Sequence, residues 1–373
     1  MGKISLLYCV DSVGEDAGTE RYVISTIRRL NGERFHVHLC CFQDSDHLRE
    51  LQSICSTRVF PLEKVFTLNG LSQIHALRRY INSNSVEIVQ TFTPKATIFG
   101  TLAAKNSKAR AIIASRRNLG YWYTPIYLRL FRYLNSHTTR LLANSEGVKR
   151  RLVEVERAEP SKVDVLYNGV DIAKFTRRGP AGATPLRKLT GGKVVGIVAN
   201  YRAVKDLELF LRAAKAVVAE VPETRFALIG QGSLGPSLKS LAAELGIQDR
   251  VFFSDGIGAV PDYLSQFDVG CLSSSSEGFS NSILEYMAAG LPTVATDVGG
   301  NREAIDDGVT GYVVANRESE ALAAPIIRLL KDDQLRTTMG QAALQRCRER
   351  FDMNSATLQL EAYYLNVLGN TKD

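Results

Sequence analysis

Short runs of β-branched and aliphatic residues alternate with longer amphipathic stretches along the chain. The first series of runs covers residues 3–10, 35–42, 86–92, 109–115, 139–144 and 163–167. After an interruption, a second series covers residues 193–199, 225–229, 251–253, 268–273, 291–295 and 311–314. Strands and helices that alternate at this spacing are typical of parallel βαβ units. The pattern therefore predicts an α/β protein with two Rossmann-like domains that face each other across a cleft.

The segment between the two series is rich in Gly, Pro and Thr and has no apolar period, which is typical of a linker. We predict an N-terminal domain over residues 1–170, a linker over residues 171–192 and a C-terminal domain over residues 193–350. The last helix, about residues 351–373, could pack back on the N-terminal domain. The length of 373 residues agrees with two domains of roughly 150 residues each.

Composition narrows the class of protein. With 45% hydrophobic and 23% charged residues, the chain resembles ordinary globular proteins and excludes a disordered or fibrous one. Its apolar runs fall short of the roughly 20 residues that a membrane-spanning helix needs. The six cysteines show no CxxC spacing, so we expect reduced thiols and a cytoplasmic protein.

Charge is distributed unevenly. The first 170 residues carry 24 basic and 15 acidic side chains and the rest carries 22 and 24, so the net charge of +7 comes entirely from the first half. Residues 88–145 contain nine Lys or Arg and no Asp or Glu. Such a stretch creates a positive potential that suits an anionic membrane, a phosphorylated acceptor or nucleic acid. A solvated basic face is the simpler alternative.

The densest group of candidate residues lies in residues 273–303. A helix is expected to begin near Ser280, because Ser and Asn are good N-caps and apolar residues follow at helical spacing. Its first amides favour an anion such as a diphosphate. Glu285, one turn further on, could accept hydrogen bonds from a ribose, and Glu277 would point into the cleft. A capped surface helix with two solvated glutamates explains the same spacing equally well.

A pair of cations follows the strand predicted at residues 193–199. Arg202 and Lys205 could reach into the cleft and neutralise a leaving diphosphate, because Arg engages two phosphate oxygens at once and Lys acts as a point charge. The alternative is a salt-bridged helix start, in which Lys205 pairs with Asp206 or Glu208.

The run Ser276-Glu277-Gly278-Phe279, with Gly290-Leu-Pro292 and Gly299-Gly300 beyond it, resembles the signature of the family 4 glycosyltransferases of the GT-B fold. The resemblance covers nearly the whole chain and is densest over residues 193–303. It implies retaining, metal-independent transfer of a hexose from a UDP- or GDP-sugar, with no bound cofactor. It also implies a glycan or lipid-linked acceptor, in cell-surface polysaccharide or glycolipid synthesis.

The resemblance assigns roles to individual residues. Glu277 would orient the hexose and Glu285 the ribose, while Arg202 and Lys205 would stabilise the departing diphosphate. The donor site would also contain Gly18, Asn200, Gly230, Gly256, Ser280, Asn281, Ser282 and Ile283. Many members have a His near the strand end at residues 86–92. This chain has Gln90 and Phe92 there instead, so the resemblance does not predict which hexose is transferred.

Residues 115–134 interleave Arg with Trp and Tyr, and Thr124-Pro125 predicts a helix start. Such a mixture suits a helix that lies on an anionic leaflet, which would make the protein peripheral on the inner face of the cytoplasmic membrane. Packing inside the first domain explains the apolar side of this helix as well. We predict that the acceptor or membrane side contains Arg116, Arg117, Arg129 and Arg132.

Two other classes of function fit parts of the sequence. The first is a nucleotide-sugar epimerase or a phosphorylase on the same fold. An epimerase needs carboxylate and His acid–base groups that this cleft lacks, and no cofactor lysine environment for a phosphorylase is visible. The second is a non-enzymatic protein that binds nucleic acid or a membrane. Nucleic-acid binding requires aromatics exposed on a sheet or groove for base stacking, whereas these lie in a predicted helix, so no nucleic acid is expected.

Overall fold

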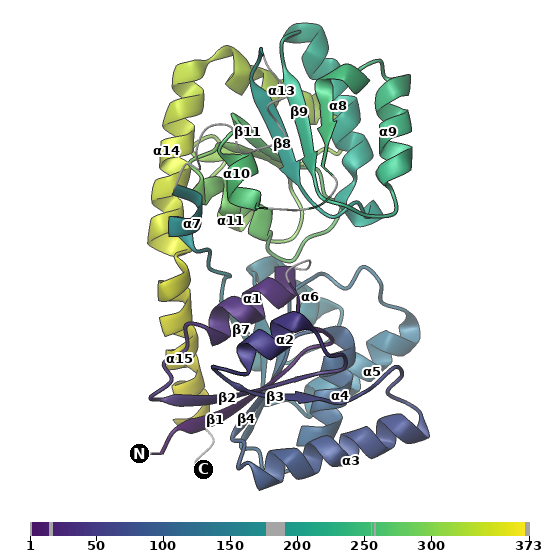
Figure 1. Cartoon of the computed structure of the whole chain (residues 1–373), viewed down its shortest axis with the longest axis vertical. Helices are drawn as coiled ribbons and strands as arrows, with labels where there is room; N and C mark the ends of the chain where they lie inside the picture. The colour runs from purple at the N-terminus through teal and green to yellow at the C-terminus, as the bar shows by residue number, and fades with distance from the viewer. Residues whose placement is uncertain (1, 15–17, 177–190, 255, 257–258, 370–373) are drawn as a thin grey trace. The chain divides into compact units, whose positions relative to one another are not determined.

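The computed structural model describes residues 2–14, 18–176, 191–254, 256 and 259–369. The chain divides into two compact units. The N-terminal unit comprises Met1–Asn168 and Asn354–Asp373, and the C-terminal unit comprises Gly169–Met353. Each unit holds a parallel sheet with helices on it, so the predicted pair of Rossmann-like α/β domains is confirmed (Figure 1). The division falls close to the boundary predicted at residue 170.

Within the described residues, the N-terminal unit has a seven-stranded parallel sheet in the order β3-β2-β1-β4-β5-β6-β7. Its strands are β1 (Ile4–Cys9), β2 (Phe35–Cys41), β3 (Ser56–Val59), β4 (Ile88–Thr91), β5 (Ala111–Arg116), β6 (Arg140–Ala143) and β7 (Val163–Val165). Strand β1 lies in the middle, where Leu6 pairs with Val37 on one side and Ile88 on the other. The sequence prediction missed β3, a short edge strand whose residues are mostly polar.

Helices cover both faces of this sheet. They are α1 (Gly18–Ile27), α2 (Asp46–Leu51), α3 (Leu68–Ser83), α4 (Pro94–Ala104), α5 (Pro125–Ser136), α6 (Glu146–Glu154) and the final helix α15 (Met353–Gly369). Apolar residues of α3, α4 and α5 share one core with the sheet, and those of α1, α2 and α15 share another. Helix α5 begins as predicted, with the Thr124 hydroxyl accepting a hydrogen bond from the Tyr127 amide and Pro125 in the first turn.

The described part of the C-terminal unit has a six-stranded parallel sheet in the order β10-β9-β8-β11-β12-β13. The strands are β8 (Val194–Val198), β9 (Arg225–Ile229), β10 (Val251–Phe253), β11 (Val269–Leu272), β12 (Thr293–Thr296) and β13 (Gly311–Val314). The helices are α7 (Ile172–Thr176), α8 (Leu207–Glu220), α9 (Gly235–Glu244), α10 (Val260–Leu264), α11 (Asn281–Ala288), α12 (Asn301–Ala304), α13 (Ser319–Lys331) and α14 (Asp333–Arg350).

The segment predicted as a linker is only partly irregular. Residues 172–176 form α7, and Phe175 packs against a hydrophobic core of the C-terminal unit. The prediction was wrong for this short helix because five residues are too few to show a helical apolar period. Residues 177–190 of the same segment lie outside the described residues.

A buried polar network fastens α15 to the N-terminal sheet. The Tyr364 hydroxyl donates a hydrogen bond to Gln90 Oε1 and shares another, of 2.6 Å, with the Tyr8 hydroxyl. Gln90 in turn donates to Ser115 Oγ at 2.9 Å. Burial raises the pKa of Tyr364 well above its ordinary value, so the phenol stays a donor at neutral pH. The last helix is therefore held by hydrogen bonds as well as by its apolar face.

Two further observations bear on the predictions from composition. None of the helices described is both long and apolar enough to cross a lipid bilayer. All six cysteines are buried and free of disulfide bonds.

Replacing Tyr364 with Phe should destabilise the protein by about 1–3 kcal/mol, because Gln90 Oε1 loses a buried donor. Tyr363→Phe is the matched control, since its hydroxyl donates to Asp164 in a half-buried position. Urea unfolding of both variants checks the comparison. Equal midpoints for Tyr364→Phe and the wild type would contradict the role of the network.

Candidate functional site

The segments that follow β8 and β11 carry most of the residues predicted to contact the donor. These strands are neighbours in one parallel sheet, so their carboxyl ends meet at the same edge. The Ser275 amide donates a hydrogen bond of 2.8 Å to the Val204 carbonyl, which joins the two loops directly. Residues more than 70 positions apart in the sequence are thereby brought together.

Lys205 and Glu277 form an ion pair at this junction. Lys205 Nζ donates to Glu277 Oε1 at 2.5 Å, and Ser274 Oγ donates to the same oxygen at 2.6 Å. The two charged side chains are largely buried, with exposed fractions of 24% and 11%. The sequence did not predict this ion pair: it gave Lys205 and Glu277 separate roles, with Asp206 or Glu208 as the alternative partner of Lys205. Instead, Asp206 pairs with Arg317.

Three consecutive serines hold this arrangement in place. Besides the bond from Ser274, Ser273 Oγ donates to the Lys205 carbonyl at 3.0 Å and Ser275 Oγ donates to the Val204 carbonyl at 3.1 Å. Ser273 and Ser274 are completely buried. These serines were not predicted as functional residues, although a polar run directly after a buried strand is a signal for them.

Arg202 and Asn200 lie at the start of the same loop. A single 3₁₀ turn over Ala203–Lys205 follows Arg202, and the Asn200 carbonyl accepts a hydrogen bond of 2.8 Å from the Arg202 amide. The Arg202 side chain is exposed, in contrast to that of Lys205. The structure therefore places two cations of different accessibility three residues apart at the edge of the sheet.

Helix α11 begins at Asn281 with Ser280 in the N-cap position, which confirms the predicted helix start. The Ser282 hydroxyl donates a hydrogen bond of 2.9 Å to the Val198 carbonyl, which links the start of α11 to the end of β8. Ile283 is fully buried, which leaves only its backbone to contact a ligand. Glu285 is 7% exposed, so it is not a solvated surface residue.

Two predicted glycines lie in turns that follow the next strands. Gly230 has a φ of +156°, and a Cβ there would lie 1.9 Å from the Ala199 carbonyl oxygen, so only glycine fits. Ser254 Oγ accepts a hydrogen bond from the Gly230 amide at 2.8 Å and donates to the Gly256 carbonyl at 2.6 Å. The turns after β9 and β10 are therefore linked beside the end of β8.

The N-terminal unit contributes one predicted donor residue. Gly18 begins α1 after strand β1, and residues 15–17 of the same predicted loop lie outside the described residues. Gln90, where many family members have a His, is 1% exposed and belongs to the buried network with Tyr364. Phe92 is also buried and packs on the Tyr8 ring, with ring centroids 4.9 Å apart.

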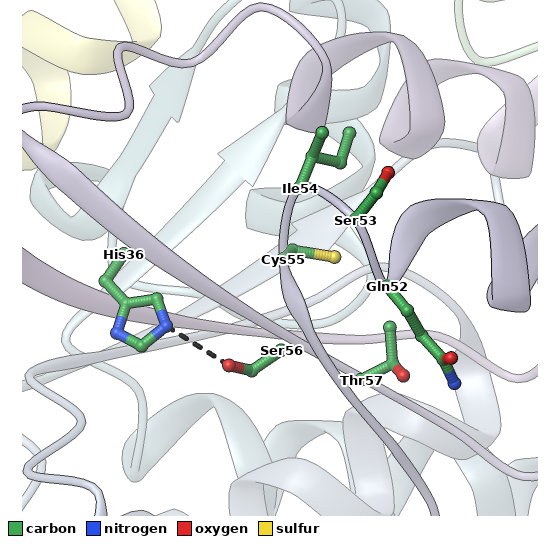
Figure 2. Close-up of a pocket in the computed structure, with 7 residues that line it drawn as sticks. All are labelled: His36, Gln52, Ser53, Ile54, Cys55, Ser56 and Thr57. Atoms are coloured by element: carbon green, nitrogen blue, oxygen red, sulfur yellow. Dashed lines mark hydrogen bonds between the residues drawn. The ribbon is translucent and has the colours of Figure 1, made fainter.

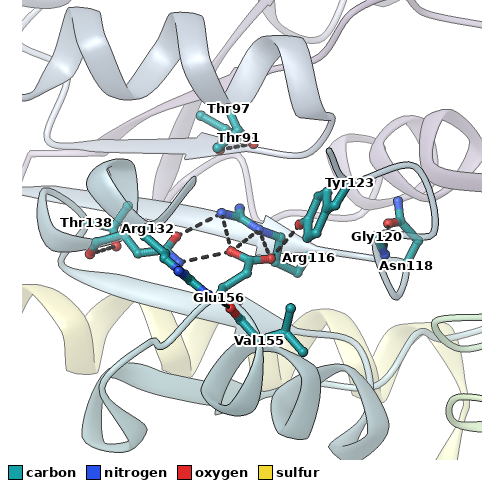
Figure 3. Close-up of polar contacts among 11 residues, drawn as sticks. Thr91, Thr97, Arg116, Asn118, Gly120, Tyr123, Arg132, Thr138, Val155 and Glu156 are labelled. Carbon is teal, nitrogen blue, oxygen red and sulfur yellow. Dashed lines mark hydrogen bonds and ion pairs between the residues drawn. The ribbon is translucent and has the colours of Figure 1, made fainter. Parts of the chain in front are cut away.

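The prediction that Arg116 faces an acceptor or a membrane was wrong (Figure 3). Arg116 is 6% exposed, pairs with Glu156 at 3.2 Å and donates to Asn135 Oδ1 at 2.9 Å. Tyr123 donates to Glu156 as well, at 2.5 Å. The carboxylate that neutralises Arg116 lies beyond the acid-free stretch of residues 88–145, so local counting could not reveal it.

The other predicted cations of this group differ in exposure. Arg117 is half-buried, lies 3.8 Å from the centre of the Tyr22 ring and donates to Asn168 Oδ1 at 2.8 Å. Arg132 donates to the Val155 carbonyl at 2.9 Å (Figure 3). Arg129, on α5, is exposed. The predicted basic surface is thus reduced, because much of its charge is bound within the N-terminal unit.

A hollow of about 540 Å³ lies beside the edge strand β3 (Figure 2). Its lining comprises His36, Gln52, Ser53, Ile54, Cys55, Ser56 and Thr57. His36 shares a hydrogen bond of 3.1 Å with Ser56, and the neighbouring His38 is buried, which lowers its pKa to about 4. None of the residues predicted to bind donor or acceptor lines this hollow.

Comparison with known proteins decides the family. The model described as "Glycosyltransferase Family 4" matches residues 17–174, and that described as "Glycosyl transferases group 1" matches residues 184–346. The chain belongs to the family 4 glycosyltransferases of the GT-B fold. This glycosyltransferase is similar in fold to Anabaena HepE, solved in complex with UDP and glucose, with a TM-score of 0.85 and 22% identity. The match covers 97% of this chain and 99% of that one.

Two curated relatives illustrate how far the sequence similarity extends. The N-acetyl-alpha-D-glucosaminyl L-malate synthase of Bacillus anthracis is 32% identical over 223 residues, and the match spans 58% of each protein. An Escherichia coli galactosyltransferase, named as acting on GlcNAc-diphosphoundecaprenol, is 21% identical over 95% of each protein. High identity is therefore confined to part of the length, and the similarity that spans the whole chain is more distant.

Replacing Arg116 with Met should destabilise the N-terminal unit by about 3–5 kcal/mol, because Glu156 is left buried without its cation. The exposed Arg129→Met is the matched control and should leave stability unchanged. Fluorescence of Trp122, the single tryptophan, reports on this unit during urea unfolding, since its ring lies 5.9 Å from that of Phe131.

The same pair predicts a pH dependence. Burial opposes ionisation of Glu156, but Arg116 and the hydrogen bonds from Tyr123 and Asn135 outweigh it and lower the pKa of the carboxyl below its ordinary value. The stabilisation is therefore complete above the ordinary carboxyl pKa and is lost as the pH falls through the lower pKa of the folded state. Equal stability of wild type and Arg116→Met at neutral pH would contradict this account.

Proposed function

We propose that the protein is a retaining, metal-independent hexosyltransferase. It transfers a hexose from a nucleoside-diphosphate sugar to a glycan or lipid-linked acceptor in the synthesis of a cell-surface polysaccharide or glycolipid. The observation that carries the proposal is the Lys205–Glu277 ion pair, held at the edge of a parallel sheet beside the start of α11. Membership of the family indicates the class of reaction, and the ion pair indicates which charged side chains would bind the donor.

The ion pair suggests how donor binding would change the contacts of Lys205 and Glu277. A diphosphate brings negative charge to Lys205, to the exposed Arg202 and to the first amides of α11, all of which favour an anion. Lys205 then moves from the Glu277 carboxylate toward phosphate, and the released carboxylate accepts hydrogen bonds from hydroxyl groups of the hexose. These cations and helix amides would stabilise charge on the departing diphosphate, which is the largest electrostatic demand of the transfer.

The named ligands and substrates of related proteins support a nucleotide sugar as donor and a lipid-linked sugar as acceptor. Anabaena HepE has been solved in complex with UDP-glucose, and the Escherichia coli relative is named for UDP-galactose and a diphosphoundecaprenol acceptor. Retention follows from the family resemblance, with the leaving phosphate taking the proton of the acceptor. An epimerase is less well supported, because all five histidines lie before residue 138, in the other unit.

The donor assignment is tested by release of nucleoside diphosphate from a panel of UDP- and GDP-sugars, with and without a diphosphate-linked lipid sugar. We expect one donor to be preferred, an increase on addition of acceptor, and the same rate with a chelator present. Product stereochemistry by NMR then tests retention. Absence of turnover with every nucleotide sugar, or an inverted product, would contradict the proposal.

Replacing Glu277 with Gln should lower kcat by at least about a hundredfold while nucleotide binding is retained, because the hexose loses a charged acceptor. The matched control is Glu208→Gln, an exposed glutamate in the first turn of α8. Steady-state rates with a saturating donor check the difference. Wild-type turnover in Glu277→Gln would refute the role of this carboxylate.

Ser274→Ala tests how the carboxylate is positioned. The variant leaves Glu277 and Lys205 present but removes the 2.6 Å hydrogen bond, so we expect a lower kcat with little change in donor KM. Ser274→Thr, which keeps the hydroxyl, should restore part of the rate. A purely structural role would instead lower stability without separating kcat from KM.

A further inference from the structure

The hydrogen-bond ladder between β8 and β11 stops short of the carboxyl edge of the C-terminal sheet. Strand β8 pairs with β9 along its whole length, but its ladder with β11 ends at the pair of Gly196 and Gly270. If the ladder continued at the spacing of a parallel pair, its next hydrogen bond would join the Val198 amide to the Cys271 carbonyl. These two backbone groups bind a side chain instead.

That side chain is Tyr286, on α11. Its hydroxyl accepts a hydrogen bond from the Val198 amide at 2.7 Å and donates one to the Cys271 carbonyl at 3.3 Å. The ring lies against Gly270, where a Cβ would be 2.5 Å from it. Tyr286 is fully buried, and burial raises its pKa well above the ordinary value, so the hydroxyl keeps its proton. A tyrosine side chain thus bridges two neighbouring strands.

The Val198 carbonyl is bound to the same helix. It accepts a hydrogen bond of 2.9 Å from Ser282 Oγ, four residues before Tyr286 and therefore on the same face of α11. Val198 is the last residue of β8, and both its amide and its carbonyl bind side chains of α11. These two bonds fix the position of α11 along its own axis.

The first turn of α11 depends on this attachment. Asn281 opens the helix, and the amides of this turn are proposed above to bind a diphosphate. The cations of the same proposed site, Arg202 and Lys205, follow β8 by a few residues. Movement of α11 relative to β8 would separate the helix amides from these cations. A misplacement of about 1 Å is enough to weaken groups that act together on one ligand.

We propose that Tyr286 is a positioning residue of the donor site, whose hydroxyl joins α11 to the ends of β8 and β11 so that helix amides and cations meet one diphosphate. The inference rests on the proposed function, because it requires the diphosphate of a nucleotide sugar to bind at this edge. Tyr286 touches no ligand, since its side chain is fully buried. It acts on the donor through the position of the first turn of α11.

Tyr286→Phe tests the proposal, because it removes the hydroxyl and keeps the ring. We expect the Kd for UDP or GDP, whichever the wild type prefers, and the donor KM to rise together by about tenfold. The matched control is Thr224→Val, which removes a buried hydroxyl that donates to the Val221 carbonyl at 2.9 Å, at the amino edge of the same sheet. Both variants should unfold at lower urea concentrations than the wild type, but Thr224→Val should keep its Kd and KM.

Calorimetry and steady-state rates are measured at a temperature at which circular dichroism shows every variant to be folded. A Tyr286→Phe variant that unfolds more easily but keeps the wild-type Kd and KM has lost a purely structural bond, and that result would overturn the proposal.

Hydrogen exchange tests the attachment without nucleotide. Peptides that cover residues 194–199 should exchange faster in Tyr286→Phe than in the wild type, because the Val198 amide has lost its acceptor. Peptides that cover residues 225–229, in β9, should exchange at the same rate in both proteins. Equal exchange over residues 194–199 would show that the hydroxyl does not hold Val198 and would contradict the proposal.

Ser282→Ala removes the other bond to Val198 and leaves Tyr286 in place. Because both bonds hold one helix to one residue, the loss of nucleotide affinity in the double variant should differ from the sum of the two single losses. A double loss equal to that sum would mean that the two hydroxyls act independently, which would count against a shared attachment.

Separate measurements of binding and transfer distinguish this proposal from the proposed function. A wild type that binds UDP or GDP but transfers no hexose would count against the transferase alone. If the wild type transfers a hexose and Tyr286→Phe matches it in Kd and KM, the transferase stands and the role of Tyr286 is wrong. A wild type that binds neither nucleotide would overturn both.

Discussion

The parallel direction of neighbouring strands is the constraint on which the rest of the molecule depends. Parallel strands gather all of their exit loops at one edge, so Lys205 and Glu277, which follow β8 and β11, meet although their positions in the sequence are distant. Tyr286 reinforces the same edge, because its hydroxyl accepts from the Val198 amide at 2.7 Å. The charged pair therefore rests on a rigid support, as the proposed replacement of Glu277 by a diphosphate requires.

Buried charge plays a different part in each unit. In the N-terminal unit, Arg116 and Glu156 neutralise each other inside the protein and have two further hydrogen-bonding partners, so they stabilise a single packing arrangement. In the C-terminal unit, Lys205 and Glu277 pair near the surface, where a ligand can compete for either charge. Arg116 and Glu156 are 6% and 3% exposed, whereas Lys205 and Glu277 are 24% and 11% exposed. This difference in exposure separates a structural ion pair from a candidate functional one.

Much of the fold could be predicted from the sequence, because β-branched runs mark buried parallel strands directly. Strands such as Arg225–Ile229 and Val251–Phe253 were predicted to the residue, whereas the edge strand at Ser56–Val59 lacks an apolar run and was missed. Which side chains pair across loops could not be predicted. Arg116 was placed at the surface because its partner, Glu156, lies 40 positions further along the chain and meets it only in the folded unit.

The central claim is that Lys205 holds Glu277 until a diphosphate replaces it. Calorimetric titration of UDP and GDP into the wild type, Lys205→Met, Glu277→Gln and the double variant tests it most directly. We expect Lys205→Met to weaken binding, and Glu277→Gln to tighten it only when Lys205 is present, because the freed ammonium then binds phosphate. Equal affinity in all four proteins would contradict the claim.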